Sequence, residues 1–511
     1  MKRFAEEITR ITTLSRALGA MASLASRSPA PGAPRVIPRA RANRRRAARA
    51  SAADTERLPP RDASTRPEDT FREPASSSAC RERGASTTEA VARDPAKRTR
   101  SSSRRAMLAA AVSAPLASAA GGALATGAVD APVDPRSYFQ DVPTLFAPLY
   151  GEDSRETRLI EIVPGEVYAL EQNLALGPLE TPLRCVVIKL KDGTTWVHAP
   201  LAPTREFFEL AESVGPVAHV VVPTYALEHK IFAKPALERW PSAKLWVAPG
   251  QFSFPLNVPL AKVFGREPDG VLGVRGDARG DACDGAMTFG ETLDVSRTNA
   301  SDPPWLDEIA CDVLRCGRFA IAGRDVTLYE ATFLHKKSKS LIVTDCVAYV
   351  PRAVPVLQTP EKLLLVGKRS TDDPQPPDTP ENRSAGWKKM ALLVTYFFPE
   401  HEELVRPGLV EWSDGWEENF DALAERLLVP PVVRATLFNQ NPKRVRAFVD
   451  RVCAEWEFDK VVPAHWAGPV AAGPAEFERA FRFLEDPSLD ALPEGDMKRG
   501  LKPIADSVAR R

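Results

Sequence analysis

Regularly spaced cysteines are absent from this chain. Its 511 residues include seven cysteines with no C-x-x-C pair, which argues against a disulfide framework, a thiolate zinc site and a thiol-dependent oxidoreductase. A charge excess is also missing, because 68 Lys and Arg residues face 67 Asp and Glu residues. Nothing therefore marks the chain as a nucleic-acid binder. The length and near-average apolar content leave room for one large or two ordinary globular domains.

Acidic residues are missing from Ile8 to Ala53, where arginine, alanine and serine are frequent. An opening of this composition is typical of an organelle transit peptide. The segment that begins at Met21 has the same character by itself, so residues 1–20 are either an upstream extension or a start assigned too early. A basic, disordered tail that binds an acidic partner is the alternative interpretation.

A strongly apolar run is absent as well. Met107–Val129 is long enough to span a membrane, but it is mostly alanine and glycine and contains Pro115. Arg104 and Arg105 precede it, and the A-x-A sites Ala117-Ser-Ala119 and Ala123-Leu-Ala125 lie within it, as in a cleaved twin-arginine signal. A transit peptide followed by such a signal resembles the bipartite targeting of thylakoid-lumen proteins. We therefore predict a chloroplast protein of the thylakoid lumen, or otherwise of the stroma, with no stable membrane span after processing.

These features divide the chain into three parts. Residues 1–129 are predicted to be a disordered transit peptide plus a twin-arginine-like signal, residues 138–484 the folded domain, and residues 485–511 a polar tail. A loop and helical insertion is predicted at about 361–440, because Thr371–Pro380 is proline-rich and helical segments follow it. The insertion forms a lid, an interface or a plain packing layer, and amphipathic helices most often cover a sheet.

Apolar patterns and turn signals place the regular elements. Asp192-Gly193 is a two-residue hairpin signal between strands. Strand, loop, helix and strand from 217 to 247 form a βαβ unit, whose functional loop lies at the carboxyl end of its first strand. The expected strands are Arg158–Ile162, Val167–Leu170, Arg184–Leu190, Thr194–His198, Val217–Val222, Lys244–Val247, Val326–Leu334, Ser340–Thr344 and Lys460–Val462. The expected helices are Pro203–Ser213, Lys230–Trp240, Trp387–Phe398, Trp416–Leu428, Pro442–Glu457 and Ala475–Leu484.

Three short segments bring an acid or a histidine to the end of an apolar strand. Glu228 and His229 follow the strand at 217–222, Asp345 follows Leu341–Thr344, and His465 follows the strand at 460–462. Ligands at strand ends converge on rigid supports while the strands themselves are buried. The recurrence predicts a metal site on the rims of the sheets, or the remnant of a site that has lost its metal.

The order of these segments resembles the metallo-β-lactamase fold superfamily. More closely, five motifs are similar to an uncharacterised plant, algal and cyanobacterial family known only as a domain of unknown function. The motifs are Trp196-Val-His-Ala-Pro, Pro223-Thr-Tyr-Ala-Leu-Glu-His-Lys, Trp246-Val-Ala-Pro-Gly, Leu341-Ile-Val-Thr-Asp and Val462-Pro-Ala-His. The resemblance covers about residues 149–484. It implies an α/β fold, a four-layer αββα sandwich with metals at one edge.

The superfamily's leading motif is His-x-His-x-Asp-His. Matching its last histidine to His229 places Glu228 at the aspartate and puts Thr224 and Ala226 at the first two histidine positions. Those two histidines bind the first metal in the superfamily. The resemblance therefore implies that most of the first metal set is missing here.

The second metal set is kept. Asp345 resembles the bridging aspartate and His465 the late histidine of the superfamily. The resemblance thus implies one divalent metal ion with four ligands, namely Glu228, His229, Asp345 and His465.

Glu330, His335 and His198 are weaker candidates for the metal. In a tight hairpin, His335 lies at the turn and on the order of 13 Å along the strand from Asp345, too far for one zinc coordination shell. The same pairing puts Glu330 across from Asp345, so Glu330 is the better near-site acid, while His335 caps the turn. His198 either faces the rim or lies in the core. Cys346, beside Asp345, either tunes the site or is a small buried residue.

Two imidazoles and two carboxylates suit Zn²⁺, Fe²⁺ or Mn²⁺, and ligand type alone does not choose among them. The predicted reaction is hydrolysis of a carbonyl or phosphoryl group, with Glu228 or Asp345 as base and with Thr224 and Tyr225 binding substrate through their hydroxyls. The alternative is a pseudoenzyme that keeps these residues as a hydrogen-bonded network and acts as a scaffold or assembly factor. The partner is accordingly an unknown small molecule or protein.

Overall fold

The computed structural model describes residues 134–140, 149, 153–251, 259–273, 303–321, 324–406 and 409–509. The transit peptide and the twin-arginine signal with Arg104 and Arg105 lie outside these residues, so both stay predictions. So do the proposed domain limits. Within the described part, none of the helices combines the length and the apolar character that crossing a membrane requires.

The first sheet has seven strands in the order β1-β2-β3-β4-β5-β6-β7. The first four strands pair antiparallel, and β4 to β7 pair parallel. Parallel neighbours bring their carboxyl ends to one edge of the sheet, so the loop after β5 lies on that edge. The strands are β1 (Arg158–Val163), β2 (Val167–Leu176), β3 (Leu179–Lys189), β4 (Thr195–His198), β5 (Val217–Val222), β6 (Lys244–Val247) and β7 (Gly270–Val271).

The second sheet has five strands in the order β16-β15-β10-β9-β8. Its central pair, β10 and β15, is parallel, and the other pairs are antiparallel. The strands are β8 (Ile309–Ile321), β9 (Arg324–His335), β10 (Ser340–Val343), β15 (Lys460–Pro463) and β16 (Val470–Ala471). Strand β8, the longest of this sheet, was not predicted from the sequence pattern.

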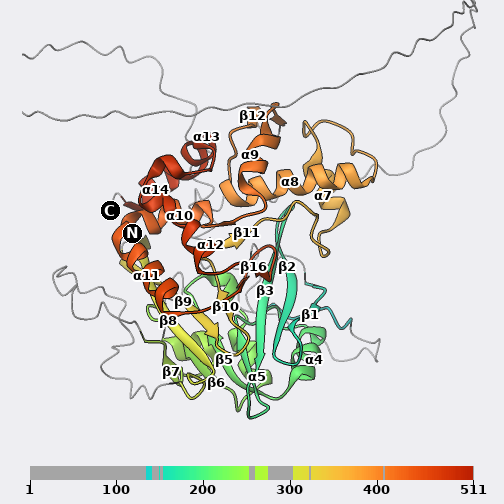
Figure 1. Cartoon of the computed structure of the whole chain (residues 1–511). Helices are drawn as coiled ribbons and strands as arrows, with labels where there is room; N and C mark the ends of the chain where they lie inside the picture. Colours follow the sequence, from blue (N-terminus) through green and yellow to red (C-terminus); the bar gives the residue numbers. More distant parts are fainter. Residues whose placement is uncertain are drawn as a thin grey trace, which may run out of the picture. The chain divides into compact units, whose positions relative to one another are not determined.

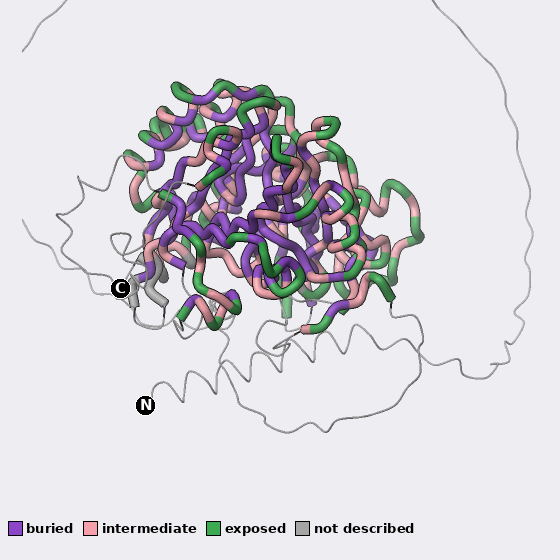
Figure 2. Tube along the Cα trace, turned by 90° about the horizontal axis from the view of Figure 1, so that it is seen from below, coloured by how far each residue is buried: buried purple, intermediate pink, exposed green. Residues whose placement is uncertain are grey.

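The two sheets pack face to face, and helices cover their outer faces (Figure 1). Alternation along each strand divides the apolar residues between the layers. In β5, Val220 and Val222 face the helices, whereas Val221 faces the second sheet. In β10, Leu341 faces the helices of the second sheet, whereas Ile342 faces the first sheet. The predicted four-layer αββα sandwich is therefore confirmed. Figure 2 shows that the buried residues, in purple, lie in its interior.

Helices α4 (Arg205–Val214), α5 (Ala233–Arg239) and α6 (Leu260–Phe264) cover the first sheet. The start of α4 follows from Thr204, whose hydroxyl accepts a hydrogen bond from the backbone N–H of Phe207 at 3.0 Å. On the second sheet lie α11 (Pro442–Glu455) and α12 (Pro474–Arg479). The predicted apolar face of α11 is confirmed, because all four of its members are buried: Val445, Phe448, Val449 and Val452.

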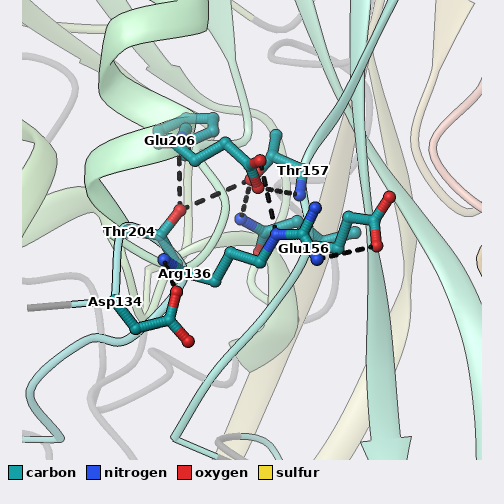
Figure 3. Close-up of polar contacts among 8 residues, drawn as sticks. Asp134, Arg136, Glu156, Thr157, Thr204 and Glu206 are labelled. Carbon is teal, nitrogen blue, oxygen red and sulfur yellow. Dashed lines mark hydrogen bonds and ion pairs between the residues drawn. The ribbon is translucent and has the colours of Figure 1, made fainter.

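The segment before β1 is fastened to the start of α4. Arg136 forms ion pairs with Glu156 and Glu206, and a carboxylate oxygen of Glu206 also accepts the backbone N–H of Thr157 at 2.6 Å (Figure 3). Tyr138 packs edge-on against Phe232, at 5.8 Å between ring centroids. The chain ahead of the sandwich therefore lies against the segment that follows His229.

The predicted insertion forms a separate layer of helices and short strands beside the sandwich (Figure 1). Its helices are α7 (Pro360–Gly367), α8 (Pro380–Tyr396), α9 (Trp416–Leu423) and α10 (Pro431–Thr436), followed by the short 3-10 helix η2 (Phe438–Gln440). Its strands are β12 (Glu402–Arg406), β13 (Leu409–Trp412) and β14 (Leu427–Leu428), and β14 pairs with β11 (Ala348–Tyr349), which lies before the predicted bounds. Helix α8 begins seven residues earlier than Trp387, at Pro380 after the capping residue Thr379. Trp387 of α8 contacts Trp466 at 5.6 Å between ring centroids, so this layer packs onto the loop that carries His465.

Regular elements continue into residues 485–509, the segment that was predicted from the sequence to be a polar tail. After η3 (Arg482–Leu484) and η4 (Pro487–Leu489), it forms α13 (Glu494–Asp496), a π-helical turn (Met497–Leu501) and α14 (Lys502–Ala509). Leu501 is fully buried in the apolar cluster of the insertion. Asp496 is buried as well, and its carboxylate accepts a hydrogen bond from Asn419 Nδ2 at 2.9 Å.

Candidate metal centre

Three side chains meet at the edge shared by the two sheets. His229 ends the short helix η1 (Leu227–His229), which follows β5 of the first sheet. Asp345 and His465 each lie two residues beyond β10 and β15, which pair in parallel with Val343 opposite Pro463. Because both residues lie two positions beyond paired residues of parallel strands, Asp345 and His465 are at the same edge of the second sheet. The centre is therefore divided between the sheets, with one histidine from the first and two residues from the second.

The donor atoms of this trio converge. Nε2 of His229 lies 3.0 Å from Nε2 of His465. Oδ1 of Asp345 lies 3.4 Å from the His229 nitrogen and 3.2 Å from the His465 nitrogen. His229 is fully buried, whereas His465 and Asp345 retain 17% and 18% side-chain exposure. The centre is thus closed on the His229 side and open to solvent on the other.

Glu228 adds a fourth candidate ligand. One of its carboxylate oxygens lies within 4.8 Å of the ring nitrogens of both His229 and His465. Its side chain is half-buried. Glu228 and Asp345 are therefore each near both histidines, but the cluster within 4.8 Å that contains Glu228 does not include Asp345, so the set of four ligands stays a prediction.

The spacing of the three nearest atoms fits a metal ion. Ligands bound at about 2.0–2.2 Å to a tetrahedral ion lie about 3.3–3.6 Å apart, and cis ligands of an octahedral ion lie about 3.0 Å apart. The observed 3.0, 3.2 and 3.4 Å fall across these two geometries. Two imidazoles and a carboxylate also form a donor set that suits Zn²⁺ or Fe²⁺. The residues present therefore fit a divalent ion.

Electrostatics pair Asp345 with the histidines. Burial raises the pKa of Asp345, but the charge of His229, its hydrogen bond and that of His465 outweigh this and hold the pKa well below its usual range. Burial lowers the pKa of His229, and the neighbouring carboxylates, Asp345 above all, raise it past its ordinary value. In the metal-free protein the charge of a protonated His229 is thus balanced by Asp345.

The loop of Asp345 is organised by Glu330, which the sequence suggested as a weaker metal ligand. Oε1 of Glu330, on β9, accepts the backbone N–H groups of Thr344, Asp345 and Cys346 at 3.2, 2.9 and 2.8 Å. Glu330 is 2% exposed. Its three backbone hydrogen bonds fix the direction in which Asp345 leaves β10. The predicted position across from Asp345 agrees with these bonds.

The carboxyl group of Glu330 gives a pH test on the metal-free protein. Burial, and then the charge of Asp345, raises the pKa of Glu330 from 4.5 to about 7. The folded state therefore holds a proton that the unfolded state has lost, so the stability from this group is full below pH 4.5 and is lost as pH rises to 7. Glu330→Gln keeps an oxygen for the three N–H groups and removes the titration. We expect the unfolding free energy of Glu330→Gln, measured by urea titration, to rise relative to that of the wild type as the pH increases from 5 to 7. A difference between the two proteins that does not change with pH would contradict this.

His198 lies behind the centre rather than in it. The side chain is fully buried, and its Nε2 is 3.3 Å from the hydroxyl of Thr344, the residue before Asp345. Burial, and then the charge of His229, lowers the pKa of His198 to about 3. Its ring stacks near Trp196, at 5.8 Å between centroids. Of the two alternatives left open by the sequence, the structure places His198 in the core.

His335 lies at the hairpin turn, away from the trio. It pairs with Ser340 in the ladder of β9 and β10, and its Nδ1 is 2.7 Å from the hydroxyl of Ser338. These contacts are those of a residue that caps the turn. His335→Ala is therefore expected to cost about 1 kcal/mol of stability, the worth of one hydrogen bond, with metal stoichiometry unchanged. Urea denaturation and plasma emission spectrometry of the purified variant measure the two quantities, and a loss of metal would contradict this placement.

Thr224 and Tyr225 occupy the loop between β5 and η1. Thr224 is buried and forms an isolated bridge with Glu330 of β9, while its carbonyl accepts Gln251 Nε2 at 2.9 Å. Thr224 thus ties the two sheets together. Tyr225 is half-buried, and burial, followed by the charge of Asp345, raises its pKa well above the ordinary value. Its hydroxyl is therefore a neutral donor beside the centre.

Two buried basic residues near the centre were not among the residues predicted from the sequence. Lys230, which follows His229, is 3% exposed, and burial lowers its pKa to about 7. Arg184 of β3 is 1% exposed and reaches the loop of His465. A charged residue inside an apolar strand was the available signal for Arg184. Cys346 is buried too, and burial, followed by the charge of Glu330, raises the pKa of its thiol well above the ordinary value.

A family model for a domain of unknown function, DUF4336, matches residues 164–483. The chain belongs to this DUF4336 family. The match spans every strand of the two sheets except β1, and it includes every residue of the centre. A search of the curated proteins finds no match to this DUF4336 protein.

Solved structures that are similar to this DUF4336 protein include two metallo-β-lactamases. The one from Pontibacter korlensis has 12% sequence identity and a TM-score of 0.26, and the match covers 65% of this chain and 100% of that one. The one from Hirschia baltica has 12% identity and a TM-score of 0.28, with 66% and 99% covered. These TM-scores are low, and the four layers follow from this chain's own sheets and helices.

Proposed function

We propose that this DUF4336 protein is a mononuclear metal-dependent hydrolase. The proposal is carried by one observation, the convergence of His229 Nε2, His465 Nε2 and Asp345 Oδ1 within 3.0 to 3.4 Å of one another. These three atoms hold the ion, and Glu228 is the fourth candidate ligand. Zn²⁺, Fe²⁺ and Mn²⁺ all accept such a set.

A divalent ion at this point supplies a Lewis acid that polarises a carbonyl or phosphoryl oxygen and lowers the pKa of water. The chain's own residues supply the rest. Glu228, half-buried at the open side, accepts a proton from water if it is not itself a ligand. Tyr225 donates a hydrogen bond to substrate through its neutral hydroxyl. Asp345 stays ionised and offsets part of the positive charge of the ion.

Chelation and refilling test the proposal. The full chain is stripped with a chelator and reloaded separately with Zn²⁺, Fe²⁺ or Mn²⁺, and each form is assayed on a carboxylic ester and on a phosphodiester. We expect turnover of one class that returns only with metal and is lost in Asp345→Asn but kept in His335→Ala. Metal uptake at the centre without turnover of either class would contradict the hydrolase.

A scaffold or assembly factor is the second candidate function. Apolar side chains exposed on the insertion favour it: Leu365 of α7 is 37% exposed, and Leu404 and Val405 of β12 are 39% and 55% exposed. A non-catalytic protein of this kind would use the insertion as its contact surface for a partner protein. The outcome of metal uptake without turnover supports this candidate.

Delivery to the chloroplast of a plant or alga is part of the proposal. It rests on the acid-free opening and on Arg104 and Arg105 ahead of the alanine-rich run. Import into isolated chloroplasts followed by protease treatment of the thylakoids tests it. We expect a processed form protected in the lumen, and Arg104→Lys together with Arg105→Lys holds that form in the stroma. Lack of import would contradict the localisation without affecting the metal centre.

A further inference from the structure

We propose that Arg184 is a positioning residue for the metal centre, acting by fixing the backbone on both sides of His465. The inference rests on the metal binding proposed above and extends it to a residue that is not a ligand. Arg184 lies on β3 of the first sheet, whereas His465 follows β15 of the second sheet. One side chain therefore joins the two halves between which the ligands are divided.

The guanidinium of Arg184 holds the carbonyl groups that flank His465. Nη1 donates to the carbonyl of Pro463, and Nη2 donates to the carbonyl of Trp466 at 2.8 Å. The backbone N–H of Arg184 adds a bond to the carbonyl of Ala464 at 2.7 Å. Three carbonyls within four consecutive residues are thus bound by a single residue of the other sheet.

This arrangement needs an arginine. The side chain of Arg184 is 1% exposed, and Nε and Nη2 also donate to Oε1 of Glu171, its cross-strand partner on β2. A buried cation costs free energy unless it is paired, and Glu171 provides the pair. The planar guanidinium can serve the carboxylate and two carbonyls at once, whereas a lysine ammonium is a single point charge with different geometry.

The backbone around His465 also needs to be held. Trp466 has a φ of +64°, a conformation that non-glycine residues adopt only where their surroundings impose it. His465 itself forms an isolated bridge with Leu183, the neighbour of Arg184. The ring of His465 must at the same time keep its Nε2 3.0 Å from that of His229. The bonds of Arg184 therefore act where a small rotation of the backbone would move a ligand nitrogen.

Metal affinity is sensitive to such support. Ligands need to be held within about 0.5 Å of their productive geometry, and loss of an outer partner of a metal ligand typically lowers affinity about 10- to 100-fold. A residue that only stabilised the fold would lower the unfolding midpoint and leave the affinity of the folded protein unchanged. The two roles are therefore separable by measurement.

Arg434 is a matched control. It is also a buried arginine, 8% exposed, with both Nη atoms on the carboxylate of Asp490 and its guanidinium 3.9 Å from the ring centroid of Phe483. It lies on α10 in the insertion. Its partners are remote in sequence from the three ligand-bearing loops.

The experiment compares Arg184→Lys and Arg434→Lys in the full chain. Affinity for Zn²⁺ is measured by competition with a chromogenic chelator, the ligand field by the visible absorption of the Co²⁺ form, and stability by urea denaturation of the metal-free protein. We expect Arg184→Lys to lower Zn²⁺ affinity about tenfold or more and to change the Co²⁺ spectrum. We expect Arg434→Lys to lower only the urea midpoint.

Other outcomes overturn the inference. Wild-type affinity and spectrum in Arg184→Lys would show that the residue acts on the fold alone, and an equal loss of affinity in Arg434→Lys would show that any buried arginine does the same. If Arg184→Lys does not fold, Glu171→Gln takes its place, because it removes the counter-ion and leaves the guanidinium free to shift; unchanged affinity there also overturns the inference. A wild-type chain that takes up no Zn²⁺ refutes the proposed function itself. A wild type and an Arg184→Lys variant that bind Zn²⁺ equally refute only the inference about Arg184.

Discussion

Asp345→Asn is expected to abolish stoichiometric metal binding. The substitution keeps the size of the side chain and removes its charge, and Oδ1 of Asp345 is the atom that lies 3.4 and 3.2 Å from the two histidine nitrogens. Loss of an outer partner of a ligand costs about 10- to 100-fold in affinity, so loss of a charged ligand is expected to cost more than about 100-fold. His465→Ala, which removes one of the two imidazoles, is expected to do the same.

Metal content after dialysis, determined by plasma emission spectrometry, measures this loss. His335→Ala is the matched control, because it also removes a buried imidazole from the strands of the second sheet and lies at the far hairpin turn. One equivalent of metal in the wild type and in His335→Ala, with little in Asp345→Asn or His465→Ala, is the expected pattern. Equal metal in all four proteins would contradict the assignment of the ligands.

Asp345→Asn also changes the metal-free protein. The pKa of His229 is raised mainly because Asp345 outweighs burial. The stability from this raised pKa is fully present below the unfolded value, near 6.5, and is lost as pH rises through the folded value. In the variant this contribution disappears, so the metal-free variant is expected to lose most stability on the acidic side of neutrality.

Trp387→Ala is expected to have the largest effect on stability. Trp387 is fully buried in the insertion, its indole N–H donates to the carbonyl of Pro351 at 2.8 Å, and its ring contacts Trp466. Truncation of a buried tryptophan to alanine typically costs about 3–5 kcal/mol. Because Trp466 follows His465, we also expect the Co²⁺ spectrum of the variant to change, which joins the insertion to the metal centre.

Trp416→Ala is the control for this prediction. Trp416 belongs to the same insertion but is half-buried and contacts Trp412 rather than Trp466. We expect it to cost clearly less than Trp387→Ala in urea denaturation and to leave the Co²⁺ spectrum as it is. Similar losses for both tryptophans, or an unchanged spectrum in Trp387→Ala, would contradict the view that the insertion supports the centre.

The placement of the ligands was predictable because it depends on local pattern. Each ligand follows a short apolar strand, and the register of such strands is set by burial on both faces. The end of a strand is therefore readable from sequence, as for Asp345 after β10 and His465 after β15. The hairpin of β9 and β10, with Leu334 opposite Leu341, was readable for the same reason.

Features that depend on partners remote in sequence were not predictable. Strand β8 is interrupted by polar residues, among them Asp312, which is buried because its carboxylate accepts two bonds from Arg451 of α11 at 2.6 and 3.1 Å. The C-terminal helices were not predicted because their apolar contacts are with a part of the chain that is remote in sequence. Leu501, for example, packs in the apolar cluster of the insertion. The role of Arg184 depends on the position of β3 beside the loop of His465, which the sequence does not show.

Glu330 shows how a residue type can mislead. A carboxylate across from Asp345 is a reasonable metal ligand on sequence grounds. In the structure one of its oxygens is committed to three backbone N–H groups of the Asp345 loop. The buried backbone N–H groups of that loop need hydrogen-bond acceptors, and the pattern of side chains does not show this need. This is why Glu330 was predicted as a ligand and is found to support the loop.

X-ray absorption at the zinc edge of the full chain tests the central claim most directly. We expect one Zn²⁺ bound by two imidazole nitrogens and carboxylate oxygen at about 2.0–2.2 Å, and we expect this zinc spectrum to be lost from dialysed His465→Ala, which does not retain the ion. Sulfur scattering at about 2.3 Å, which would place the ion at cysteines, or a spectrum that His465→Ala leaves unchanged, would contradict it.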